Sequence, residues 1–356
     1  MKHFFFLDQS EFLNQFFDNA HVELKKPASS ASMTKIQSLL YMAVSNPASA
    51  SSLDPHKEQL RAVMSTTPLY NWLLTVVSKR AGEGILAAMK GPSESKAEEA
   101  KEKDKEITSR SQHLALESRY QLIAFHVAAV EALSFDFDVQ FPLSLVISRK
   151  AITRYQLIFR FLLSLRYLEF SLANMWSEHK TANWRRSTGS PDMERWKRHI
   201  FVLRAQMLQW VQHMLGFVTG DVLETKWKKL EDKLSKVSTI DQLLRDHVEY
   251  LDTCLKECTL TSNKLITVGL SHRADGIYAY GADVHPLVAR QVTSKLVKTI
   301  TTFANHQSIF SRLLTSFKAD PRAESTEDKI AKRWGLIQKF ETHFAHHVAT
   351  HLDTVT

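Results

Sequence analysis

Glycine and proline are scarce in this sequence. Its 356 residues include 10 glycines and 9 prolines, about 5% of the chain, whereas the two residue types together usually supply about 12%. Strand-rich folds turn often, and tight turns use the unusual backbone angles of these two residues. The shortage therefore disfavours an all-β fold and predicts long helices joined by few turns.

Cysteine and long apolar runs are also scarce. The two cysteines, Cys254 and Cys258, lie four residues apart in a helical pattern, where disulfide geometry is unfavourable. Two spare cysteines in a long chain are typical of a reducing compartment, the cytosol or the nucleus. No stretch reaches the roughly 18 apolar residues of a membrane span, and the apolar residues 4–7 meet Asp8 too soon for a signal peptide.

Sequence motifs of catalysis are absent. There is no glycine-rich dinucleotide fingerprint, no P-loop and no nucleophile elbow. His343, His347 and His351 recur at helical spacing with His346 beside them, as the ligands of a metal site would. No set of acidic ligands accompanies them, which favours the polar flank of an amphipathic helix. We therefore predict no catalytic residue, no cofactor, no metal and no small-molecule substrate, and thus no enzyme.

The formal net charge is +8, with an isoelectric point near 9.3. Such a chain attracts acidic partners, unless the excess is spread over solvated faces. The segment 184–186 (Trp-Arg-Arg) and the cations Arg195, Lys197 and Arg198 are a weak signal for nucleic acid, without a recognisable binding motif. A basic nucleic-acid-binding protein therefore remains an alternative, although the residues disfavour it.

Apolar periodicity predicts helices along most of the chain. They are expected over residues 10–24, 33–44, 54–60, 68–79, 149–176, 193–218, 239–258, 286–317 and 325–352, with amphipathic segments at 114–133 and 221–236 and a further helix opened by Pro142. Residues 27–32, 46–53 and 183–191 read as loops. Phe135, Phe137 and Val139 alternate with Asp136 and Asp138, which predicts one short strand with both acids facing water.

Two segments interrupt this pattern. Residues 91–112 are densely charged and nearly free of apolar side chains, which is typical of a flexible insertion, and residues 271–285 read as an inserted loop. The predicted fold class is all-α, an elongated bundle of long helices with at most a short strand or hairpin and two long flexible insertions. The expected division is an N-terminal helical subdomain (1–90), the charged insertion (91–112) and a C-terminal helical bundle (113–356).

A known family is suggested by several segments in the right order. The segment 131–160 (EALSFDFDVQFPLSLVISRKAITRYQLIFR) closely resembles the gamma-tubulin complex proteins, of the component-2 type, in their C-terminal half. Residues 4–8 with 23–27, residues 249–258, and residues 340–344 followed by His346 and His347 continue the resemblance. It covers nearly the whole chain. The N-terminal half of that family is not in the sequence, as expected of a fragment or a truncated product.

The resemblance implies a function. The C-terminal half of these proteins is a non-catalytic helical domain that binds gamma-tubulin. The assembled complexes present gamma-tubulin in a ring that templates microtubules at centrosomes and spindle poles. The implied partners are gamma-tubulin and other gamma-tubulin complex proteins, of the component-3 type, in the cytoplasm and cytoskeleton. A helical assembly scaffold without direct tubulin binding is the closest alternative.

Basic residues mark a candidate contact surface within the most family-like segment. Arg149, Lys150 and Arg154 open the long helix and are the contact candidates. In the alternative reading, Arg149 and Arg154 instead orient the 135–141 segment from within. The neighbouring apolar residues are expected to pack inside the domain rather than to contact a partner: Phe135, Phe141, Pro142 and Leu143.

Overall fold

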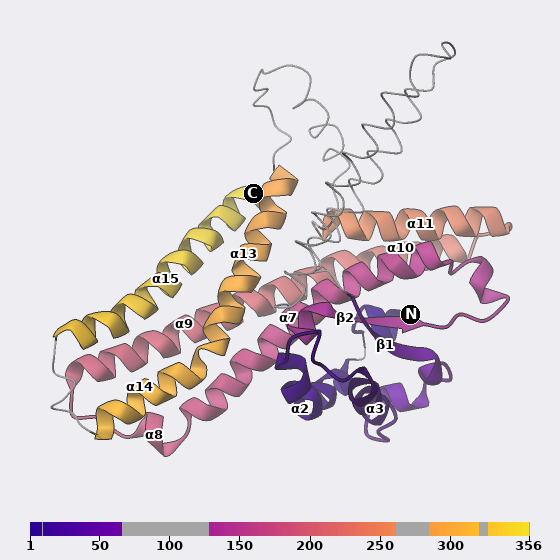
Figure 1. Ribbon diagram of the computed structural model, residues 1–356. Helices are drawn as coiled ribbons and strands as arrows, with labels where there is room; N and C mark the ends of the chain where they lie inside the picture. Colours follow the sequence, from indigo (N-terminus) through magenta and orange to yellow (C-terminus); the bar gives the residue numbers. More distant parts are fainter. Residues whose placement is uncertain (9, 66–127, 259, 261–284, 320–326, 356) are drawn as a thin grey trace, which may run out of the picture. The chain divides into compact units, whose positions relative to one another are not determined.

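The computed structural model describes residues 1–8, 10–65, 128–258, 260, 285–319 and 327–355 (Figure 1). The chain divides into two compact units, the first containing Met1–Arg160 and the second containing Phe161–Thr259 and Tyr280–Thr356. The predicted boundaries at 90 and 112, the helix at 68–79 and the 91–112 insertion lie outside the described residues. So does the 271–285 loop except for its last residue. These remain predictions.

The all-α prediction is confirmed, with one two-stranded sheet. The elements of the first unit are α1 (Lys2–Phe5), α2 (Glu11–Lys25), α3 (Met33–Val44), η1 (Ala50–Leu53), η2 (Lys57–Gln59), β1 (Leu60–Met64), α6 (Ala129–Ala132), β2 (Leu133–Phe137), η3 (Leu143–Leu145) and the beginning of α7 (Arg149–His179). The helices predicted at 10–24, 33–44 and 149–176 are present as α2, α3 and α7. The side chain of Ser32 caps α3 by accepting from the backbone N–H of Lys35.

The helix predicted at 54–60 is wrong at its end. Only η2, a single 3-10 turn, forms there, and Leu60 instead begins strand β1. β1 pairs antiparallel with β2, so that Leu60 lies opposite Phe137. Pairing with a strand about 70 residues away along the chain overrides the local preference, which a local pattern does not reveal. For the same reason the amphipathic segment 114–133 ends in one helical turn, α6, before β2 starts at Leu133.

Side chains cover both outer edges of this small sheet. Gln37 of α3 accepts from the backbone N–H of Ala62 at 2.6 Å, and its amide donates to the carbonyl of Leu60 at 3.4 Å. On the opposite edge, Gln156 of α7 donates to the carbonyl of Phe135 at 2.9 Å. A two-stranded sheet exposes unpaired backbone groups on both sides. The two glutamines satisfy some of these groups and tie the sheet to its flanking helices.

Aromatic side chains fill the core of the first unit. The rings of Phe135 and Phe159 stack with their centroids 4.3 Å apart. Phe5 contacts both Phe159 and Tyr155, at 5.9 and 5.7 Å between centroids, and Phe4 contacts Phe137 at 6.2 Å. Such rings bury large areas and favour offset or edge-on contacts. The sheet, α1 and the start of α7 are therefore held by one shared cluster of aromatic rings.

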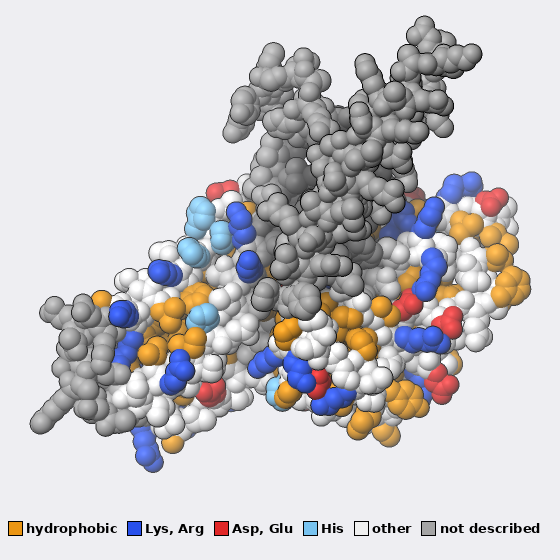
Figure 2. All heavy atoms as spheres, in the orientation of Figure 1, with side chains coloured by type: hydrophobic (Ala, Val, Ile, Leu, Met, Phe, Trp, Pro, Cys, Tyr) orange, Lys and Arg blue, Asp and Glu red, His pale blue; other side chains and the backbone are white. Residues whose placement is uncertain are grey.

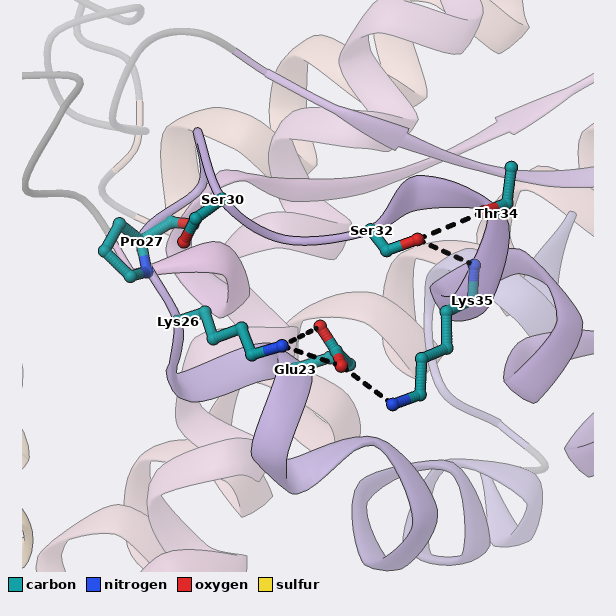
Figure 3. Close-up of polar contacts among 7 residues, drawn as sticks. All are labelled: Glu23, Lys26, Pro27, Ser30, Ser32, Thr34 and Lys35. Carbon is teal, nitrogen blue, oxygen red and sulfur yellow. Dashed lines mark hydrogen bonds and ion pairs between the residues drawn. The ribbon is translucent and has the colours of Figure 1, made fainter.

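A carboxylate between two lysines joins α2 to α3 (Figure 3). The side chain of Glu23 is only 4% exposed and lies 2.9 Å from the ammonium of Lys26 and 2.8 Å from that of Lys35. The hydrogen bond from Lys35, followed by that from Lys26, lowers the pKa of Glu23 to about 2. Because Glu23 belongs to α2 and Lys35 to α3, this ionic cluster links the two helices.

The second unit is built from helices throughout its described part. These are the remainder of α7, α8 (Ala182–Arg185), α9 (Pro191–Gly216), the π-helical η4 (Phe217–Glu224), α10 (Thr225–Leu234), α11 (Ile240–Glu257), α13 (His285–Asn305), α14 (Gln307–Ala319) and α15 (Glu327–Val355). The helix predicted to be capped by Thr239 is present, since the Thr239 hydroxyl accepts from the N–H of Gln242.

Three details of this unit differ from the prediction. The short helix α8 interrupts the loop expected at 183–191. The segments 193–218 and 221–236 form one continuous helical run, joined through η4, because the chain has no proline there to stop it. The helix expected at 286–317 breaks at His306 into α13 and α14. The break brings Phe303 and Phe310, one from each helix, within 5.6 Å of each other in the core.

Buried polar groups accompany the apolar core of this unit. The rings of Trp184 and Trp196 stack with their centroids 6.2 Å apart. The guanidinium of Arg204 lies 4.9 Å from the ring centre of Trp176. Cys254 and Cys258 are buried free thiols, whose pKa values are raised by burial.

None of the described helices has the length and apolarity needed to cross a membrane.

Candidate functional site

An exposed apolar segment follows strand β2. It runs through η3, and its side chains of Phe141, Leu143 and Leu145 are 78%, 53% and 53% exposed. The bond between Phe141 and Pro142 is cis, and Pro142 is also exposed. Phe135, by contrast, is fully buried. The packing expected of Phe141, Pro142 and Leu143 is therefore not found among the described residues, because the sheet ends at Phe137 and these three residues follow it.

Two hollows flank this segment within the first unit. The smaller, of about 270 Å³, is lined by apolar side chains that include Phe4, Phe137, Phe141 and Leu143. The larger, of about 450 Å³, lies between the end of β2 and the start of α7, and its lining includes Ser148 and both members of two ion pairs. The exposed segment and the hollows together form a surface that mixes apolar and charged side chains, which we call the η3 surface (residues 138–150).

The two ion pairs involve the acids of β2 and the residue after it. Arg149 contacts Asp136 at 2.6 Å, and Arg61 of β1 lies 3.6 Å from Asp138. The hydrogen bond from Arg149 to Asp136 raises the pKa of the guanidinium. Asp138 faces water, as predicted, whereas the Asp136 side chain is only 23% exposed. The pair with Asp136 matches the alternative reading of Arg149, in which it orients the strand segment.

The other two contact candidates lie on the first turns of α7. Lys150 is exposed and Arg154 is partly exposed. Arg154 donates to the backbone carbonyl of Lys150 at 3.3 Å, and positions four residues apart lie on the same side of a helix. Of the three cations, Arg149 is exposed but has a carboxylate partner within the chain, and Lys150 is exposed as well.

Sequence reasoning missed the exposed apolar part of this surface. Its signal was present, because apolar residues continue at 141, 143, 145 and 147 after the strand alternation has ended. The pattern alone does not distinguish a partner surface from an internal loop. Arg61, which contributes to the same surface, was missed because strand β1 was not predicted.

The residues considered for nucleic acid do not lie together on the surface. Trp184 is buried, and the ammonium of Lys197 is also buried, 2.8 Å from Glu194 and donating to the carbonyl of Trp184 at 3.1 Å. Arg185 and Arg186 are exposed. Without an exposed ring, the segment 184–186 offers no stacking surface for bases. Within the described residues, no group of three or more histidine, cysteine or acidic side chains is placed to hold a metal ion.

Comparison with known proteins places the chain in a family. A family model described as gamma tubulin complex component C-terminal matches residues 1–356. The chain belongs to the gamma-tubulin complex component family. It is 34% identical over 98% of its length to spindle pole body component alp4 of Schizosaccharomyces pombe, and 31% identical over 75% of its length to Gamma-tubulin complex component 2 of Mus musculus.

The chain spans less than half the length of each of these two relatives. The chain covers 42% of the length of the yeast relative and 26% of that of the mouse relative. A Gamma-tubulin complex component 3 homolog of Xenopus laevis is 27% identical over 37% of the chain. The component-2 resemblance is thus confirmed. The family is one of complex components and not of enzymes, and the η3 surface lies within the matched residues.

Proposed function

We propose that this chain binds gamma-tubulin as the C-terminal domain of a component of a microtubule-nucleating complex. The observation that carries the proposal is its membership of the gamma-tubulin complex component family over residues 1–356. The net charge of +8 supports it, because long-range attraction to an acidic protein speeds association and orients the encounter. Other complex components, of the component-3 type, are the proposed neighbours in the assembly.

The η3 surface is the proposed place of contact. Protein interfaces draw most of their affinity from a few apolar and arginine side chains that become fully desolvated. Phe141, Leu143 and Leu145 are such apolar groups, and they are exposed just before the first turns of α7, which carry Lys150 and Arg154. Arg149 has a second role, since its ion pair with Asp136 fixes the position of this surface against β2.

The same relationship suggests where the protein acts. Relatives named as spindle pole body components support a location at microtubule-organising centres and spindle poles. We propose that the domain has no catalytic activity of its own and that nucleotide chemistry belongs to its tubulin partner. The domain contributes affinity and position only.

Binding is tested by mixing the purified chain with gamma-tubulin and measuring the mass of the complex by light scattering on a sizing column. A stable one-to-one complex is expected. If no complex forms while the helical circular dichroism spectrum is intact, the proposal fails and the scaffold alternative takes its place. If the chain instead binds DNA, with affinity falling steeply as salt rises, the nucleic-acid alternative is supported.

Paired variants locate the contact. Phe141→Ser with Leu143→Ser, and separately Lys150→Glu with Arg154→Glu, are each expected to weaken gamma-tubulin binding about tenfold or more, as loss of central interface residues does. Met42→Ser is the matched apolar control, since Met42 of α3 is 60% exposed and lines neither hollow. If both double variants bind gamma-tubulin as tightly as the control variant does, the contact lies elsewhere, and the proposed binding function is unaffected.

A further inference from the structure

A stripe of cationic side chains runs along α15, the last helix. Lys332, Lys339, His343 and His346 are all exposed, and their spacing of 7, 4 and 3 residues places them on one side of the helix. From Lys332 to His346 the stripe spans about 21 Å at 1.5 Å per residue. The apolar residues between them, Phe340 and Phe344 among them, are turned into the core.

Helix α13 packs against α15 and widens this stripe. Its Lys295 and Lys298 are exposed. The ring of His347 lies 5.3 Å from that of His346 and 6.5 Å from that of His343. Burial, followed by the charges of His346, Lys295 and His343, lowers the pKa of His347. Histidine side chains gather beside lysine or arginine on this face in Figure 2.

Carboxylates are sparse on the same face. Within the described residues, none of the four lysines of α13 and α15 named above forms an ion pair. Glu341 points to the opposite side of α15, where it lies 3.8 Å from His199 of α9. By helical spacing, Asp328, four residues before Lys332, and Asp353, seven residues beyond His346, lie on the stripe side at its two ends. Helix α9, which also packs against α15, contributes Trp210 against His351 and no acid to the stripe.

We infer that this face of α13 and α15, the cationic stripe, docks an acidic polypeptide segment. An extended peptide advances about 3.3 Å per residue, so six or seven residues match the length of the stripe. Carboxylates placed there relieve the repulsion among the crowded imidazoles and lysines. The stripe presents no exposed phenylalanine, tyrosine or tryptophan for base stacking, which favours a polypeptide over a single-stranded nucleic acid. The inference concerns the second unit and is independent of the η3 surface.

The exposed lysines of the stripe supply the binding strength. Each carboxylate that pairs with one of them strengthens binding by roughly two- to fivefold, the size of an exposed ion pair. Because Lys332 and Lys339 are both exposed, their substitution leaves the fold unchanged.

The test measures fluorescence anisotropy of a labelled peptide of about ten glutamates, long enough to span the stripe, added to the whole chain at constant salt. Binding of the glutamate peptide is expected, and Lys332→Gln with Lys339→Gln should weaken it about fivefold or more, the loss of two exposed ion pairs.

The control is Lys228→Gln with Lys229→Gln, which removes two exposed lysines of α10 and should leave binding unchanged. The inference is overturned if a glutamine peptide of equal length binds as well, or if the Lys332 and Lys339 double variant binds as tightly as this control. It is also overturned if single-stranded RNA of equal charge binds more tightly than the glutamate peptide. The Lys332 and Lys339 double variant should still capture gamma-tubulin, so the two proposals fail separately.

Discussion

Acid should destabilise the second unit through one buried histidine. His179, at the end of α7, is 2% exposed among the rings of Trp184 and Phe201, at 4.5 and 4.8 Å. Its Nε2 lies 3.2 Å from the side-chain oxygen of Gln307, and its Nδ1 is buried with no hydrogen-bond partner. Protonation would therefore create a second N–H without an acceptor, in an apolar site.

The size of the effect follows from the pKa shift. Burial, the largest cause, lowers the pKa of His179 from 6.5 to about 4, which corresponds to about 3 kcal/mol at about 1.4 kcal/mol per unit. Because the folded pKa is depressed, the unfolded state takes up the proton first. The stabilising contribution of neutral His179 to the free energy of unfolding is complete above about pH 6.5. It falls by about 2 kcal/mol at pH 5 and levels off below pH 4.

The variant His179→Phe tests this reasoning. It keeps an aromatic ring but cannot titrate, and it leaves the Gln307 oxygen without its donor, at a cost of about 1 kcal/mol. The variant should be less stable than the wild type at pH 7 and more stable at pH 5, so the two stability curves cross. Free energies of unfolding come from urea titrations at each pH, followed by circular dichroism. A difference that stays constant within about 0.5 kcal/mol between pH 7 and pH 5 would refute the assignment.

Three further outcomes are expected. Gln37→Ala leaves the edge N–H of Ala62 unpaired and should lower the free energy of unfolding by about 1 kcal/mol, measured by urea titration. Glu23→Ala should lower the melting temperature at pH 7. Because the folded pKa of Glu23 is depressed to about 2, its contribution is present above about pH 4.5 and is lost as the pH falls toward 2, so the wild type and the variant should converge there. Cys254 and Cys258 are buried with raised pKa values, so a thiol reagent should modify neither until the chain is unfolded, as mass spectrometry would show.

Sequence patterns predicted the helices whose signals are local. Apolar periodicity located α2, α3, α7 and α11, and the capping hydroxyl of Thr239 marked a helix start to within a residue. Strand β1 and the break at His306 were not predicted, because both depend on distant partners: β2 in one case, and the rings of Trp196 and Phe340, which contact Phe310 and Phe303, in the other. Such partners do not appear in a local window.

The candidate site was predicted only in part, for a related reason. The cations at the start of α7 were evident from their cluster inside the family-like segment. Which of them is already paired depends on the register of β2, which places Asp136 within 2.6 Å of Arg149. Likewise, Phe135 is buried and Phe141 is exposed, although the two phenylalanines lie only six residues apart in one motif.

The exposure of three large apolar side chains in a row is itself an argument for a partner. Full burial of one such side chain is worth about 1.5–3 kcal/mol, and the chain forgoes this at Phe141, Leu143 and Leu145 while burying Phe135 completely. Single exposed apolar residues need no explanation, but a contiguous group beside hollows of about 270 and 450 Å³ marks an interaction surface. A partner that buries these side chains gains the free energy that folding of the chain does not use. The Phe141 and Leu143 double variant is therefore more decisive for locating the contact than the Lys150 and Arg154 double variant.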